Sequence, residues 1–69
     1  MKLQELQKRL GTNVKRLRKE KGWVQEDMRD FGMNYRYFQS IEGWEANATL
    51  DTLLKLAKAF KVSVIDLLK

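Results

Sequence analysis

The sequence contains no cysteine, no histidine and no proline. Without cysteine there is no disulfide and no thiolate chemistry, and without histidine there is no imidazole acid–base catalysis and no zinc site of the Cys/His kind. No apolar run approaches the ~20 residues of a membrane-spanning helix, and the first residues lack the apolar core of a signal peptide. We therefore expect a cytoplasmic protein with no cofactor, no metal and no membrane partner.

The chain is short, with 69 residues, of which 43% are apolar and 33% are charged. This composition is typical of one soluble globular domain that spans residues 1–69. So few residues do not readily enclose a pocket, and there is no glycine-rich phosphate loop. An enzyme is therefore the least favoured class, and no small-molecule substrate is expected.

Basic residues outnumber acidic ones, by fourteen to nine, which gives a net charge of +5. The excess lies in residues 1–41, which hold ten basic and five acidic residues, whereas residues 42–69 hold four of each. A basic half on so small a domain favours a polyanionic partner, nucleic acid before an anionic membrane. On charge alone, a surface that merely keeps the protein soluble fits equally well.

Apolar residues recur every three or four positions at Leu3, Leu6, Leu10, Val14 and Leu17, which predicts one face of a helix. Lys19, Lys21 and Gly22 are typical of the end of that helix. The segment 1–10 is either an extension of the helix, a separate turn or a frayed arm. Thr12 or Asn13 could also start the helix afresh as a cap.

A short helix is predicted over residues 25–31, where Gly32 ends it. Three further helices follow. Asn34, Thr49 and Ser63 are typical N-caps for them. Their expected core positions are Phe38 and Ile41, then Leu50, Leu53, Leu54, Ala57 and Phe60, and finally the apolar residues of the last turn. No segment alternates long enough to form a strand, so the sequence predicts an all-α domain of four to five helices around one core.

Residues 25–42 predict a helix-turn-helix, because two short helices flank a tight turn that contains Gly32. In the second helix, Phe38 and Ile41 define a buried face at ~100° per residue. Arg36, Gln39 and Ser40 then lie on the exposed face, with Tyr35 and Tyr37 on its flanks. Arginine pairs with guanine, glutamine with adenine, and serine with several base edges. An ordinary amphipathic helix with a solvated face is the alternative.

At this point the chain resembles the phage-repressor/Cro-type helix-turn-helix family, also called the XRE family. The matching residues are Gln25-Glu26-Asp27-Met28, Gly32-Met33-Asn34, Phe38, Ile41-Glu42, the run from Leu50 to Val62, and Val14, Leu17, Arg18 and Gly22 in the first helix. They cover about residues 10–68. The resemblance implies a lambda-repressor-like fold, in which the second helix of the motif enters the major groove of DNA.

The resemblance makes residues 35–42 the recognition helix. It implies base or groove contacts from Tyr35, Arg36, Gln39 and Ser40, and backbone contacts from Gln25, Asn34 and Tyr37. It also implies an ion pair between Arg18 and Glu42 that ties the first helix to the recognition helix.

Three positions depart from the family pattern. One residue fewer lies between Gln25 and Gly32, so the second helix is short or its turn is built differently. Arg29 stands where the family favours alanine between the two helices, so it reaches out to solvent or another side chain fills that slot. Glu45 lies in a loop that is often basic, where it would disfavour a phosphate, and Trp44 beside it either packs under the loop or contacts a partner.

The last helix carries Val64, Ile65, Leu67 and Leu68 in barely one and a half turns, so they cannot all point inward. We expect Leu67 to fill the core together with Val64 or Leu68. Val64, Ile65 and Leu68 are the expected homodimer interface, which would set two recognition helices ~34 Å apart on double-stranded DNA.

The leading hypothesis is thus a sequence-specific DNA-binding transcription regulator, expected to be a repressor that acts as a dimer. The alternative is a protein-interaction module or antitoxin on the same fold, with weak or lost DNA binding. A membrane-surface domain that uses the leucine-striped N-terminus is the least favoured binding function.

Overall fold

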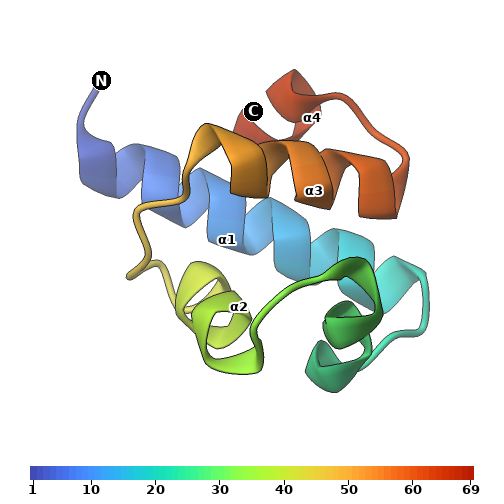
Figure 1. Ribbon diagram of the computed structural model, residues 1–69. Helices are drawn as coiled ribbons and strands as arrows, with labels where there is room; N and C mark the ends of the chain where they lie inside the picture. Colours follow the sequence, from blue (N-terminus) through green and yellow to red (C-terminus); the bar gives the residue numbers. More distant parts are fainter.

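A computed structural model describes all 69 residues, and its regular elements are all helices. In chain order they are α1 (Leu3–Glu20), the 3-10 helix η1 (Gln25–Phe31), α2 (Tyr35–Glu42), α3 (Leu50–Phe60) and α4 (Val64–Leu68). Figure 1 shows α1 crossing the molecule, with the green η1 and α2 below it and the orange α3 and red α4 above it. The expected all-α fold of four to five helices with a helix-turn-helix is confirmed. No helix is both long and apolar enough to cross a membrane.

The first helix, α1, runs without interruption from Leu3 to Glu20. Residues 3–10 are therefore a helical extension rather than a separate arm. Gly11 is buried in the middle of α1. The side chain of Asn13 caps nothing at the N-terminus; its amide donates to the carbonyl oxygens of Leu67 and Lys69, at 2.9 and 3.2 Å. The middle of α1 thereby fixes the C-terminal end of the chain.

The other α-helices begin at the predicted caps. Backbone amides donate to the side chains of Asn34, Thr49 and Ser63, so one of the orphan N–H groups at each helix start has a partner. Gly32 closes η1 in the left-handed region, at a φ of 79°. Glycine adopts this φ without the steric penalty that a Cβ atom brings, so the turn between η1 and α2 can be tight.

The second helix is a 3-10 helix rather than the short α-helix that the sequence predicts. A 3-10 helix rises ~2.0 Å per residue and an α-helix ~1.5 Å, so fewer residues span the same length. This geometry accommodates the residue that is missing between Gln25 and Gly32. Within η1, the side chain of Met28 faces the core and is completely buried, whereas Arg29 is exposed to solvent.

The core holds twelve buried apolar residues from all five helices and the turn before α2: Leu10, Val14, Met28, Met33, Phe38, Ile41, Leu53, Leu56, Ala57, Ala59, Phe60 and Leu67. Two predicted core positions are wrong, because Leu50 is 84% exposed and Leu54 is 47% exposed. Leu54 lies ~100° around the helix from the buried Leu53. Leu50 is the first residue of α3. Leu56 takes the core position instead.

Candidate nucleic-acid interface

Helix α2 is fixed to the core by Phe38 and Ile41, which are buried. Because side chains advance ~100° per residue, this leaves Arg36 and Gln39 on the opposite side, where both are exposed. The helix has no acidic residue before Glu42, which faces inward. The exposed face is therefore polar and cationic.

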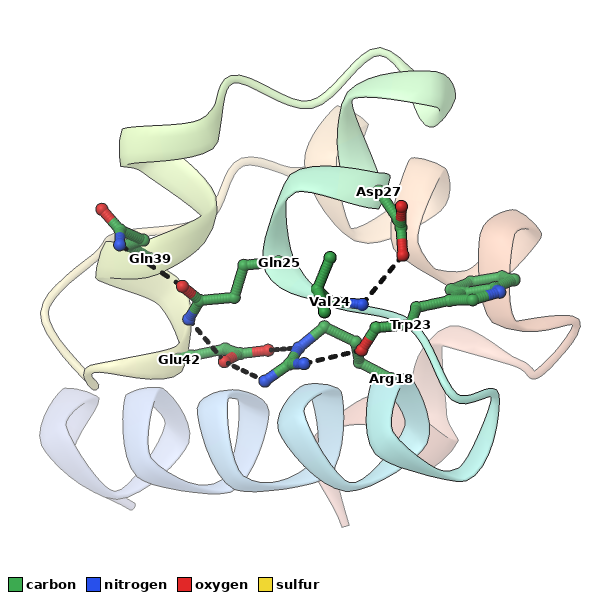
Figure 2. Close-up of polar contacts among 7 residues, drawn as sticks. All are labelled: Arg18, Trp23, Val24, Gln25, Asp27, Gln39 and Glu42. Atoms are coloured by element: carbon green, nitrogen blue, oxygen red, sulfur yellow. Dashed lines mark hydrogen bonds and ion pairs between the residues drawn. The ribbon is translucent and has the colours of Figure 1, made fainter.

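A buried ion pair joins α1 to the C-terminal end of α2 (Figure 2). Arg18 Nε donates to Glu42 Oε2 at 2.7 Å, and Arg18 Nη2 donates to Glu42 Oε1 at 3.1 Å. Arg18 Nη1 donates to the carbonyl oxygen of Trp23 at 2.8 Å. This fork geometry fixes direction as well as distance. The pair therefore sets how α2 lies against α1.

Two glutamines extend this network to the exposed face of α2 (Figure 2). Gln25 Nε2 donates to Glu42 Oε1 at 2.9 Å, and Gln25 Oε1 accepts from Gln39 Nε2 at 3.3 Å. Gln39 Nε2 also donates to the hydroxyl of Tyr35 at 3.0 Å. These hydrogen bonds thus orient the side chains of Gln39 and Tyr35 in the free protein.

The other predicted contact residues differ in whether their polar atoms already form hydrogen bonds within the chain. Asn34 is exposed, but its Oδ1 accepts from the Tyr37 amide. The Tyr37 hydroxyl donates to the Asn47 carbonyl oxygen at 3.3 Å. Ser40 is half-buried, and its hydroxyl donates to the Tyr37 carbonyl oxygen at 2.6 Å. Ser40 and Tyr37 therefore already use their donors within the chain.

Arg29 lies on the same side of the molecule as the start of α2. Its guanidinium sits 5.4 Å from the centre of the Tyr35 ring, which is within cation–π range. With Met33, Asn34, Tyr35 and Arg36 it lines an open hollow of about 460 Å³. Arg29 thus reaches out to solvent, and it brings a second cation to the N-terminal end of α2.

The loop after α2 is held by a residue that sequence reasoning did not identify. Gln7 on α1 donates to the carbonyl oxygens of Glu45 and Ala46, at 3.3 and 3.2 Å, and to Asn47 Oδ1 at 2.9 Å. No local pattern marks Gln7, because its partners are 38–40 residues away. Glu45 itself is exposed.

The apolar residues of α4, which include the three expected dimer residues Val64, Ile65 and Leu68, have different environments. Leu67 is completely buried, Val64 and Leu68 are half-buried, and Ile65 is 70% exposed. The two leucines of α3 that lie outside the core, Leu50 and Leu54, add to the apolar surface of this half of the molecule.

Comparison with known proteins gives a consistent result, although no family model matches the chain. The uncharacterised HTH-type transcriptional regulator y4dJ of Sinorhizobium fredii is 39% identical over 64 residues, which are 91% of this chain and 83% of that protein. A crystal structure of a hypothetical transcription factor, NHTF from Neisseria, is 31% identical and has a TM-score of 0.88, covering 100% of this chain and 80% of that chain. The chain thus belongs to the family of helix-turn-helix transcriptional regulators.

Proposed function

We propose that the protein is a sequence-specific, double-stranded DNA-binding transcriptional regulator of the Cro/XRE type. The observation that carries this proposal is the exposed face of α2, which is polar, cationic and braced by the Gln39–Gln25–Glu42–Arg18 network. A rigid helix with such a face suits the major groove, where base edges present hydrogen-bonding groups. The kinship with transcriptional regulators supports the same function.

Within this proposal, Tyr35, Arg36, Gln39 and Ser40 contact base edges or the groove, and Gln25, Asn34 and Tyr37 contact the backbone. Arg36 is the principal base reader, because it points away from the Phe38/Ile41 face and makes no ion pair within the chain. Arg29 adds positive charge beside it. The N-terminal end of α2 also favours anions through its unpaired amides.

We further propose that the protein acts as a homodimeric repressor. One eight-residue helix offers few base contacts, and a two-fold dimer doubles them on a palindromic site. Val64, Ile65 and Leu68 form the interface in this proposal, and the exposure of Ile65 supports it. The two α2 helices would then lie ~34 Å apart, one turn of DNA.

The test begins with selection of a preferred duplex from a random-sequence pool, followed by titration of that duplex and of a scrambled one at several salt concentrations. Arg36→Ala should weaken binding to the preferred duplex by ~1–3 kcal/mol and relax the preference at one base pair. Arg9→Ala, which removes an exposed charge from α1, is the charge-matched control and should leave the preference intact. Failure of the pool to yield any preferred sequence would contradict the proposed function.

A further inference from the structure

A cleft of about 660 Å³ opens between α1 and the end of α2, outside the residues assigned above to DNA contacts. Trp44 is the one hydrophobic residue of its lining, which consists of Gly11, Thr12, Lys15, Arg16, Lys19, Glu20, Glu42 and Trp44. We call it the α1–Trp44 cleft.

The cleft carries uncompensated positive charge. Its two acidic residues are already paired, Glu20 with Arg16 at 3.2 Å and Glu42 with Arg18 at 2.7 Å. Lys15 and Lys19 form no ion pair. They are separated by four positions, so they share one face of α1.

Lys8 extends this face toward the N-terminus, because it lies seven residues before Lys15. Its ammonium nitrogen is 5.2 Å from the centre of the Trp44 ring. From Lys8 to Lys19 the strip of lysines follows α1 for ~16 Å, at a rise of ~1.5 Å per residue.

Trp44 is held at the mouth of the cleft in an unfavourable backbone conformation. Its φ is 67°, in the left-handed region that bulky residues rarely adopt. The residue is nevertheless 48% exposed, so burial of the indole does not account for its position. The ring lies over Gly11, where a side chain would leave it no room. Its position thus leaves about half of the residue exposed beside Lys8.

The cleft adjoins the C-terminal end of α2, because Glu42 is one of its lining residues. Glu42 lines the cleft and also accepts from Gln25, which in turn accepts from the exposed Gln39 (Figure 2). The cleft therefore lies beside the end of α2, the proposed recognition helix. A strip of lysines with no apolar anchor except Trp44 fits a phosphate chain better than it fits a membrane surface, which needs a broad apolar face.

We propose that the α1–Trp44 cleft binds the sugar-phosphate backbone of the DNA that α2 reads. Lys15 and Lys19 contact phosphates, and the Trp44 ring packs against the adjoining sugar. This inference rests on the proposed function, and it assigns a second backbone-binding surface that lies on α1 rather than on the helix-turn-helix.

The test compares two double variants that remove the same amount of charge. Lys15→Gln/Lys19→Gln alters the cleft, and Lys55→Gln/Lys58→Gln alters exposed lysines of α3, which does not line the cleft. With the selected duplex, the slope of log K against log salt should fall by ~0.9 for each phosphate that is no longer neutralised, hence by about 2 in the cleft variant. The α3 variant should keep the wild-type slope.

Fluorescence supplies a second, independent readout. Iodide quenching of the wild-type protein reports the exposed indole of Trp44, whereas Trp23 is half-buried against Phe31 and Phe60. The duplex should protect the emission from iodide, and Trp44→Phe should remove that protection while circular dichroism stays unchanged.

Equal slopes for the two double variants, together with unchanged iodide quenching when DNA is added, overturn the cleft assignment. If Arg36→Ala still relaxes the sequence preference in that case, the proposed function stands and only the cleft fails. If the wild-type protein binds no duplex at any salt concentration, the proposed function itself fails, and the cleft assignment fails with it.

Discussion

Helices α2 and α3 are both short amphipathic helices that pack against α1, but they present opposite kinds of surface to solvent. Outside its buried face, α2 exposes Arg36 and Gln39. Outside its buried face, α3 exposes Leu50 and Leu54 beside its lysines. The same apolar periodicity thus builds both helices, and they differ in the face left exposed, which is polar and cationic on α2 and partly apolar on α3.

The two helices are also held in different ways. A bidentate ion pair and two glutamines fix the end of α2, whereas α3 is held by apolar side chains and by the Thr49 cap at its N-terminus. A buried ion pair contributes little net stability because desolvation opposes it, but it defines a geometry. Burial of apolar groups is non-directional. Of the two helices, α2 is therefore the one whose orientation is fixed by directional contacts between side chains.

The largest effect is expected when this directional contact is broken from one side. Glu42→Gln leaves Arg18 buried without its countercharge, and removal of one partner from a buried pair costs ~3–5 kcal/mol. Glu20→Gln, which breaks the exposed Arg16 pair on the same helix α1, should cost only ~0–1 kcal/mol. Urea denaturation of both variants measures the difference, and equal destabilisation would show that the Arg18–Glu42 pair has no special structural role.

The next effect concerns the close approach of α2 to α1 at Gly11. A methyl group there would overlap the carbonyl oxygen of Ile41 and lie 2.6 Å from Trp44 Cδ1. Alanine normally stabilises a helix interior relative to glycine by ~1 kcal/mol, but overpacking costs ~1–3 kcal/mol. Gly11→Ala should therefore lower the thermal midpoint, whereas Thr12→Ala at the exposed neighbouring position should raise it slightly. A Gly11→Ala protein that is more stable than wild type would contradict the packing between these helices.

A smaller effect on stability, but a clear one on assembly, is expected at α4. Ile65→Lys places a charge at a position that is 70% exposed, so the fold of the monomer should survive. If α4 forms the dimer, the dissociation constant should rise at least tenfold, ~1.4 kcal/mol. Sedimentation equilibrium at tens of micromolar measures it. The control is Val24→Lys, which changes an exposed apolar residue outside α4 and should leave the dimer intact. A wild-type protein that stays monomeric both alone and in the presence of DNA would refute the interface.

The smallest effect is a pH dependence at the start of α4. Hydrogen bonds from the Lys69 side chain, the Ser63 backbone and the Ser63 hydroxyl lower the pKa of the Asp66 carboxyl below its ordinary value of 3.8. Because the folded-state pKa is lowered, the contribution of the carboxylate is present above pH 3.8 and is lost as the pH falls through the folded pKa. Carbon NMR of Asp66 should show a titration midpoint that rises in Lys69→Ala. An unchanged midpoint would show that Lys69 is not the main cause of the lowered pKa of Asp66.

Much of the local structure follows from the sequence alone. Asn34, Thr49 and Ser63 cap the helices at the predicted positions, and Gly32 makes the turn with a positive φ. The exposure of Arg36 and Gln39 also follows from the helical period once Phe38 and Ile41 are buried. The Arg18–Glu42 contact is predicted only by resemblance to a family, because no spacing rule links residues that are 24 positions apart.

Other features depend on neighbours that are distant in the sequence. Period alone could not decide which leucines of α3 are buried, because Leu50, Leu53, Leu54 and Leu56 spread over an arc of ~160° and only part of that arc faces the core. The side of α3 against which α1 and α4 pack decides which of these leucines are buried. Gln7, Gly11 and Trp44 likewise have no local signature, since their roles arise where α1 meets the end of α2 and the following loop.

The sequence by itself determined the helices, their caps and the polar face of α2, because these depend on groups within about four residues of one another. The tertiary structure alone decided which leucines of α3 remain exposed, the network beneath Gln39, and the cleft between Lys15, Lys19 and Trp44. These features exist only when segments distant in the chain are brought together, so no pattern within one helix contains them.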